Sequence, residues 1–222
     1  YYIDLSKISL SEFKKRLKNA DLLPSQKILE EDLDGHFKIL KDLKIKHMAD
    51  LQLQLKSKKD VDEFAQKSGL SIDYLTILRR EVNSYHPKPN NLKDFPGILK
   101  KIISTLEKKG IKHTGHIFEF IKDKNSRKKF SQENNINADD LLELTKLTDL
   151  SRIKWVGPLF ARMLLDAGFD SAKKVSEADY KGLYEKLMKM NEGNKYYKGK
   201  FGVNDMKLCV TVAKDVPDEI EF

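Results

Sequence analysis

Two short segments of the sequence place a glycine beside lysines and in front of an apolar helical pattern. One is Ile153-Lys154-Trp155-Val156-Gly157-Pro158, and the other is Phe95-Pro96-Gly97-Ile98-Leu99 followed by Lys100 and Lys101. At a helix start the backbone N–H groups lack internal partners, and the helix dipole adds partial positive charge. Glycine lets a ligand approach such groups closely. These segments could therefore bind an anion such as a phosphate oxygen.

Other groupings of reactive side chains are weaker. His113 and His116 share a helix face, but no third ligand follows at a recognisable spacing, so we expect no metal site. Paired acids such as Asp139-Asp140 suit a helix start better than acid–base catalysis. The sequence has neither a P-loop nor a Gly-x-Gly-x-x-Gly motif, and Cys209 lies at an apolar helical position where we expect burial. We expect no catalytic site and no cofactor.

Two basic segments leave alternatives open. The run Lys122–Lys129 carries five positive charges and one negative charge, and it either tracks a phosphate backbone or forms a solvated helix face, which is commoner. The segment Lys195–Phe201 interleaves cations with aromatic residues, a composition typical of surfaces that stack on single strands. Its alternative is a loop whose aromatic rings tuck onto the core.

The composition is that of a helical, globular chain. Its 222 residues include 42 Lys+Arg and 34 Asp+Glu, a net charge of +8, and only 11 Gly and 6 Pro, which favours helices. No apolar run approaches the roughly 20 residues of a membrane span, so no membrane partner is expected. The single cysteine excludes an internal disulfide and a cysteine-built zinc site, and it favours a reducing, cytoplasmic location.

Helix-start signals recur along the chain, and only Tyr1–Leu5 is rich in β-formers. Capping boxes are predicted at Ser9 with Glu12 and at Asp60 with Glu63, and single caps at Asn137 and Asn204. We therefore predict an all-α fold with an N-terminal arm. The prolines of His86–Asn91 break helix continuity, so we expect an N-terminal domain of residues 1–90 and a second helical domain of residues 91–222.

The sequence also matches itself. At an offset of 66, residues 33–78 align with 99–144 without a gap, and twelve of the 46 positions are identical. At an offset of 58, Phe95–Leu99 aligns with Ile153–Gly157, and Gly110-Ile111 aligns with Gly168-Phe169. We predict three degenerate helical repeats that begin near residues 29, 95 and 153 and stack on one another. In the third, Pro158 should open a helix that Gly168 ends, and Phe169 should pack back after the turn.

The third repeat resembles the helix-hairpin-helix motif of DNA-repair and replication proteins. Its segment Ile153–Ser171 carries the hairpin, an alanine and a leucine at helical spacing, and the exit Gly168-Phe169-Asp170-Ser171. Phe95–Leu99 with Leu106 and Gly110-Ile111 is similar to a second copy. Over nearly its whole length the chain also resembles an uncharacterised, mainly bacterial family of tandem units of this kind, in segments such as Leu78-Arg79-Arg80-Glu81-Val82.

Each hairpin departs from the family pattern. Trp155 stands where the first glycine belongs, and Leu99 stands where the second belongs. Trp155 could stack on a base or sugar, anchor a partner, or cover the helix junction as core, which we favour. The first repeat has no glycine there, and its acids Glu30, Glu31 and Asp32 would repel an anion, so we expect it to be structural.

The resemblance and the hairpin chemistry together predict a non-catalytic protein that binds nucleic-acid backbones. Such contacts carry no base information, so binding would tolerate any sequence, and the modest charge predicts weak affinity. The alternative is a protein-interaction scaffold of stacked helices. The candidate residues are Lys154, Trp155, Val156, Gly157, Leu159 and Arg162 chiefly, and Gly97, Ile98, Lys100 and Lys101 secondarily.

Overall fold

The computed structural model describes residues 1–20 and 22–222. Every regular element in these ranges is helical, and extended backbone forms only two isolated bridges, Ser9 with His47 and Asn91 with His113. The prediction of an all-α chain is confirmed. The β-rich start forms no strand, and a short 3-10 helix, η1, spans Leu5–Lys7.

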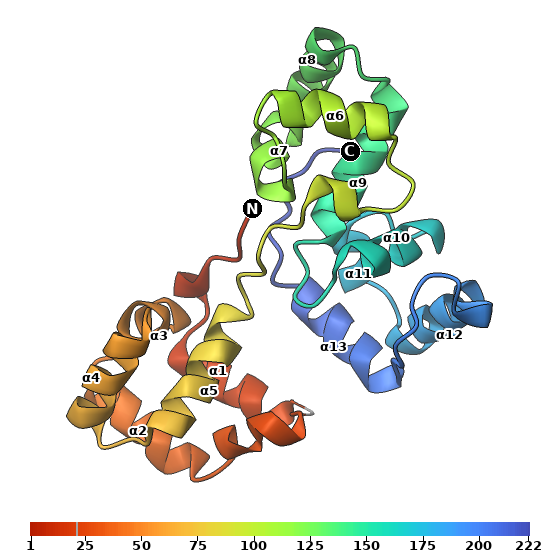
Figure 1. Ribbon diagram of the computed structural model, residues 1–222. Helices are drawn as coiled ribbons and strands as arrows, with labels where there is room; N and C mark the ends of the chain where they lie inside the picture. The colour runs from red at the N-terminus through yellow and green to blue at the C-terminus, as the bar shows by residue number, and fades with distance from the viewer. Residues whose placement is uncertain (21) are drawn as a thin grey trace. The chain divides into compact units, whose positions relative to one another are not determined.

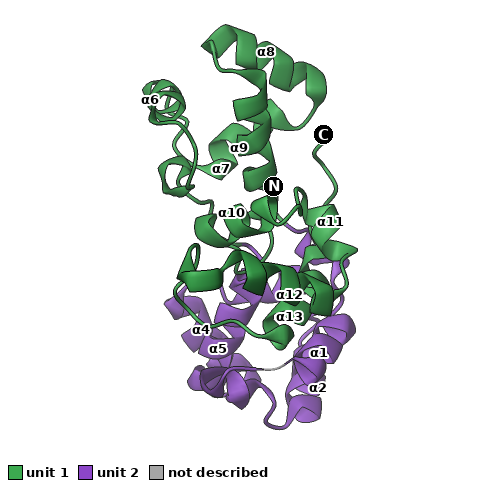
Figure 2. Cartoon of the chain, turned by 90° about the vertical axis from the view of Figure 1, so that its right-hand side faces the viewer, with its two compact units in different colours: residues 1–2, 87–222 green, residues 3–86 purple. Residues whose placement is uncertain are grey.

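The chain divides into two compact units, which Figure 2 shows in different colours. The N-terminal unit comprises residues 3–86, and the C-terminal unit comprises residues 87–222 with Tyr1 and Tyr2. The division falls within the proline-containing segment His86–Asn91. Tyr1 joins the C-terminal unit because its ring packs edge-on against Phe118, at 5.3 Å between centroids, and its hydroxyl bonds to Thr114 Oγ1 at 2.8 Å.

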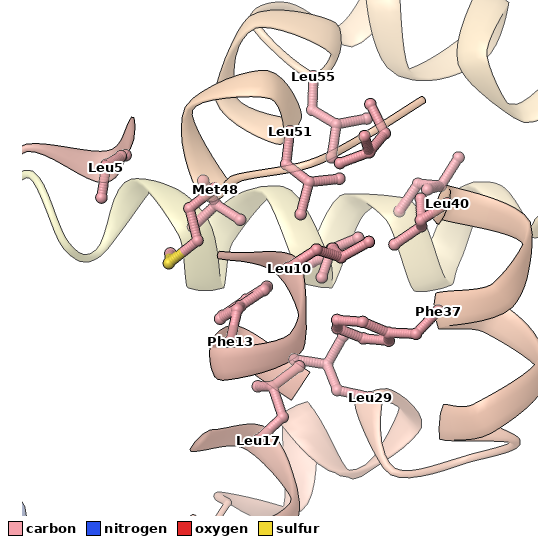
Figure 3. Packing of buried hydrophobic residues seen from close by; sticks show 14 of the residues in the cluster. Leu5, Leu10, Phe13, Leu17, Leu29, Phe37, Leu40, Met48, Leu51 and Leu55 are labelled. Carbon is pink, nitrogen blue, oxygen red and sulfur yellow. The ribbon is translucent and has the colours of Figure 1, made fainter. Parts of the chain in front are cut away.

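The N-terminal unit is a bundle of short helices around one core. The helices are α1 (Leu10–Asn19), η2 (Pro24–Leu29), α2 (Leu33–Asp42), α3 (Met48–Gln54), α4 (Lys58–Ser68) and α5 (Ile72–Asn83), as drawn in Figure 1. Figure 3 shows Phe13 of α1 and Phe37 of α2 pointing toward one another, and their ring centroids are 6.0 Å apart. Leu17 and Leu29 close the same core.

The C-terminal unit has two buried clusters that share one long helix. Its helices are η3 (Leu92–Asp94), α6 (Lys100–Lys108), α7 (Thr114–Ile121), α8 (Lys124–Asn134), α9 (Ala138–Leu150), α10 (Pro158–Asp166), α11 (Ala172–Ser176), α12 (Tyr180–Met190), η4 (Glu192–Asn194) and α13 (Val203–Ala213). Leu141 and Leu144 of α9 pack into the cluster of α6–α8. Leu147 and Leu150 pack into the cluster of α10–α13. Helix α9 therefore ties the two clusters together.

The helix boundaries follow the offsets found in the sequence. Helices α3, α4 and α5 begin at residues 48, 58 and 72, and α7, α8 and α9 begin 66 residues later at 114, 124 and 138. After α2, α6 and α10, the backbone is left-handed at Lys44, Gly110 and Gly168, with φ of 67°, 79° and 90°. The following residue donates its N–H back to the helix, and at α10 this bond runs from Phe169 to Leu164 at 2.9 Å. Gly168 therefore ends α10 and Phe169 is buried, as predicted.

Two of the four predicted cap residues, Ser9 and Asn137, are confirmed, but the reciprocal half of the box predicted at Ser9 is absent, because the Glu12 carboxylate accepts from Arg16 Nε instead. Ser9 Oγ accepts the N–H of Glu12, and Asn137 Oδ1 accepts the N–H groups of Asp139 and Asp140. The cap at Asp60 is wrong because α4 begins three residues earlier than expected. Ser57 is its cap, and Asp60 supplies the returning carboxylate, with bonds of 3.2 and 2.7 Å.

The cap at Asn204 is also wrong. Helix α13 begins at Val203, so Asn204 already lies inside its first turn. Gly202 occupies the cap position, and the Asp205 carboxylate accepts its N–H at 2.7 Å. In both α4 and α13, the carboxylate of an aspartate at the third helical position accepts the backbone N–H of the true cap residue.

Two histidines cap α7. His113 Nδ1 accepts the N–H of His116 at 3.2 Å, and His116 Nδ1 accepts the N–H of Lys112 at 3.3 Å. At α3 the corresponding residue is Asp50, whose carboxylate accepts two backbone N–H groups. Burial and the neighbouring His116 lower the pKa of His113. Because Nδ1 accepts a hydrogen bond only while unprotonated, the cap of α7 should weaken in acid.

We expect His116→Asp to make the stability of the chain less sensitive to pH between about 5 and 7. In the original chain His113, whose pKa is lowered by burial and by His116, binds fewer protons in the folded state than in the unfolded chain, and His116→Asp removes the second of these causes. The contribution of His113 is therefore complete above the unfolded pKa of about 6.5 and is lost as the pH falls. Loss of the cap should cost about 1 kcal/mol. Urea unfolding of both proteins at neutral and acidic pH measures the difference, and an equal pH dependence would contradict this explanation.

Candidate functional site

The α10 hairpin, defined as residues 153–157, connects α9 to α10. The side chains of Ile153 and Val156 are buried, and the Val156 N–H donates to the Ile153 carbonyl at 3.0 Å. Between them Trp155 adopts the left-handed region with φ of 67°. Gly157 is extended, with φ of −85° and ψ of 177°, and Pro158 opens α10 as predicted.

The start of α10 leaves backbone donors without partners. No acceptor in the described ranges receives the N–H of Gly157, Leu159 or Phe160, and no side chain caps the helix. A Cβ added to Gly157 would meet no atom within 4 Å, so the space before these donors is open. Unpaired N–H groups at a helix start favour an anionic ligand.

The α6 hairpin, defined as residues 95–99, also precedes a helix start with unpaired N–H groups. Gly97 is left-handed with φ of 85°, and a Cβ there would lie 2.9 Å from a guanidinium nitrogen of Arg162. Helix α6 begins at Lys100 without a side-chain cap, and the N–H groups of Lys100 and Lys101 have no acceptor in the part of the chain that the structure describes. Both lysines are exposed, whereas Ile98 packs against the core.

Lys154 and Arg162, two predicted contact residues, are buried. Lys154 is 2% exposed, and its ammonium lies 3.9 Å from the centroid of the Trp155 ring. Arg162 donates to the Pro96 carbonyl at 2.8 Å and pairs with Glu143 at 2.6 Å, so it holds α10 to the α6 hairpin. Contrary to the prediction, neither side chain is placed to contact a phosphate.

Trp155 has the opposite environment from the one that we favoured. It is 55% exposed and does not belong to the core. Its left-handed backbone turns the side chain outward at the position that Gly97 occupies in the α6 hairpin, 58 residues earlier. Leu159 is also exposed, at 47%. Two large apolar side chains therefore flank the open N–H groups around Gly157.

The aromatic loop, residues 195–201, lies beside α10. Asn191 holds it, because its side chain accepts the N–H groups of Tyr196 and Tyr197 and donates to the Tyr197 carbonyl. The rings of Tyr197 and Phe201 pack around Phe160 of α10, with centroids 6.2 and 5.7 Å away. The tucked-loop alternative therefore describes this segment, although Tyr197 and the loop's three lysines stay exposed.

A family model described as "Domain of unknown function (DUF4332)" matches residues 96–213, more than half of the chain. The chain belongs to this family. The DUF4332 match runs to the last residue of α13, and it contains residues 96–99 of the α6 hairpin, the whole α10 hairpin and the aromatic loop. Searches of the curated proteins and of the solved structures found no significant match.

Two other segments of this DUF4332 protein offer no comparable site. In the basic run, Lys122 pairs with Glu119, Lys124 with Glu221 and Lys129 with Glu133. Its arginine, Arg127, is buried and donates to two backbone carbonyls, so the run forms an ion-paired helix face. At the start of α2, the Asp32 carboxylate accepts the N–H of Gly35. This side chain therefore fills the position at the helix start that an anionic ligand would need.

A buried charge cluster that the sequence pattern does not indicate lies next to the α10 hairpin. Arg152 is 2% exposed and donates to Asp149 at 2.9 Å, to Glu219 at 2.7 Å and to the Tyr1 carbonyl at 3.0 Å. The second oxygen of Asp149 accepts the N–H of Ala172 at 2.7 Å. Burial raises the pKa of Asp149, while the Ala172 N–H and Arg152 oppose that rise. The cluster fixes the end of α9 to the start of α11.

Neither a metal centre nor a reactive thiol accompanies these hairpins. Within residues 1–20 and 22–222, no group of three or more His, Cys, Asp or Glu could hold a metal ion. Cys209 is buried, as predicted, and burial raises its pKa to about 12, so the thiol stays protonated at neutral pH. No helix in the same ranges is long and apolar enough to cross a membrane.

Proposed function

We propose that this DUF4332 protein is a non-catalytic nucleic-acid-binding protein that contacts backbone phosphates without sequence preference. One observation carries the proposal. Helices α6 and α10 both begin directly after a hairpin with a left-handed residue, without a capping side chain, and with unpaired N–H groups. Phosphate oxygens match such donors in charge and in hydrogen-bonding capacity.

Because Lys154 and Arg162 are buried, the positive charge that attracts a phosphate must come from other residues. The α6 hairpin brings its own exposed cations, Lys100 and Lys101. The α10 hairpin depends on its N–H groups and on the lysines of the aromatic loop beside α10. Because Arg162 bonds to Pro96, the two hairpins are held in one fixed arrangement. We therefore propose that both hairpins contact the same nucleic-acid backbone and contribute comparably to the affinity.

We further propose that these hairpins are helix-hairpin-helix units and that α2–α5 and α6–α9 are copies of one repeat. The shared 66-residue spacing of helix starts supports this interpretation. In the N-terminal copy, the Asp32 cap replaces the phosphate site, so that copy is structural. A cytoplasmic location is part of the proposal, because a lone thiol suits a reducing compartment.

Binding should depend on salt in proportion to the few phosphates that are contacted. We expect the logarithm of the association constant to fall with the logarithm of salt concentration with a slope of about −2 to −4. Fluorescence anisotropy of labelled DNA and RNA oligonucleotides over a salt series measures this slope. Equal affinities for unrelated sequences are expected. Absence of binding at low salt would overturn the proposal.

Gly157→Glu provides the specific test at the α10 hairpin. The new carboxylate would occupy the open space before the N–H groups, where it would repel phosphate, so affinity should fall about tenfold or more at low salt. The matched control is Gln66→Glu on the exposed face of α4, which adds one carboxylate to the N-terminal unit without straining the backbone. An equal loss in both variants would indicate a non-specific charge effect.

The exposed apolar pair Trp155 and Leu159 favours a second candidate, a protein-interaction scaffold. In that case, no oligonucleotide would bind at low salt, and replacing these two residues would abolish association with a protein partner. The same anisotropy series therefore separates the two candidates.

A further inference from the structure

We propose that Trp155 is a stacking platform for an unpaired nucleobase, so that the α10 hairpin prefers single-stranded segments to fully paired duplex. The inference rests on the proposed function, because it specifies the class of nucleic acid that the same hairpin binds. Three observations around the indole ring carry it.

The first observation is that the ring is held in place and open to a ligand. The Lys154 ammonium lies 3.9 Å from the ring centroid, a cation–π contact that covers one face. Lys154 itself is buried, while Trp155 remains 55% exposed. The indole therefore has a contact that restrains its orientation, and more than half of it is open to solvent. A ring held in this way loses little freedom when a base stacks on it.

The second observation is the backbone at Trp155. Its φ of 67° lies in the region that favours glycine, and the α6 hairpin has Gly97 at this position. A bulky residue there strains the backbone, and an exposed indole adds no core packing in return. Folding alone therefore gives no reason for a tryptophan at this turn. A ligand that stacks on the face of the indole would give such a reason.

The third observation is the setting of the ring. Trp155 precedes the unpaired N–H of Gly157 by two residues, so a phosphate bound there would bring bases of the same strand near the indole. The exposed Tyr197, whose ring centroid lies 6.2 Å from that of Phe160 in α10, is surrounded in sequence by Lys195, Lys198 and Lys200. Aromatic rings among backbone-binding cations characterise single-strand recognition. In a duplex the bases are stacked on one another and cannot reach such a ring.

The single tryptophan makes the test direct, because all tryptophan fluorescence comes from Trp155. Three probes of equal length are titrated at low salt: a dT oligonucleotide, the corresponding abasic deoxyribose-phosphate strand, and a blunt duplex. We expect dT to quench the fluorescence and to bind about tenfold more tightly than the abasic strand. We expect the duplex to bind without quenching.

Variants separate stacking from phosphate binding, with affinities measured by anisotropy of the labelled probes. Trp155→Gly suits the left-handed backbone and should fold, yet it should bind dT only as well as the abasic strand. Trp155→Phe should retain a preference for dT. The control Leu53→Ala removes an exposed apolar side chain in the N-terminal unit and should change none of these affinities.

The outcomes distinguish the two proposals. If all probes bind equally, without quenching, and Trp155→Gly leaves affinities unchanged, the stacking inference is overturned while phosphate binding stands. If no probe binds, both proposals fall. A protein partner lost in Trp155→Gly, with no binding of oligonucleotides, would assign the indole to a protein interface instead.

Discussion

Arg152→Met should lower the free energy of unfolding by about 3–5 kcal/mol. The guanidinium is buried and is the charged partner that holds Asp149 in the interior between α9 and α11. Methionine fills much of the same volume, so the loss comes from the uncompensated carboxylate and not from a cavity. Urea unfolding at neutral pH measures the change.

The pH dependence of this variant identifies the cause. Burial already raises the pKa of Asp149, and loss of Arg152 raises it further. A carboxyl group with a raised folded-state pKa destabilises the protein increasingly as the pH rises through that pKa, so the variant's deficit should shrink in acid. The control is Lys173→Met, which breaks an exposed 3.0 Å pair with Asp218 and should leave the free energy of unfolding nearly unchanged, because solvent screens that pair. A deficit independent of pH would point to packing instead.

Much of the fold was readable because helices leave periodic signals. The apolar spacing and the scarcity of glycine and proline predicted an all-α chain, and Pro158 and Gly168 marked the ends of α10 correctly. The caps at Asp60 and Asn204 were misplaced because a polar residue in the first turn resembles a cap residue. Only the path of the chain shows which side chain reaches the N–H groups.

The site was less predictable, because side-chain exposure depends on tertiary packing. Lys154 and Arg162 stand beside a hairpin glycine, which made them candidates for phosphate contact, yet both point into the unit. Arg162 does so because the Pro96 carbonyl and Glu143 converge on it from elements distant in the sequence. Trp155 reverses this pattern, since its left-handed backbone directs an apolar ring outward. The i, i+3 spacing of Asp149 and Arg152 was the one local signal of the buried cluster.

The two hairpin glycines should respond very differently to substitution. Gly97→Val should destabilise the chain by about 2–4 kcal/mol, because a β-branched residue is strained at φ of 85° and its Cβ would press on the Arg162 guanidinium. Gly157→Ala should change stability by less than about 1 kcal/mol, since its extended backbone suits any residue before proline and its Cβ meets no neighbour. Thermal unfolding of both variants tests this contrast, and equal losses would show that the turn geometry is misassigned.

The same pair then shows why glycine stands at residue 157. Folding does not require it there, because the left-handed position of this hairpin is filled by Trp155. A remaining reason is access, since a side chain at 157 would project into the space before the unpaired N–H groups. Gly157→Ala should therefore keep its stability and still bind oligonucleotides several-fold more weakly. An alanine variant that is stable and binds as well as the original chain would show that phosphate does not approach the α10 hairpin at this point.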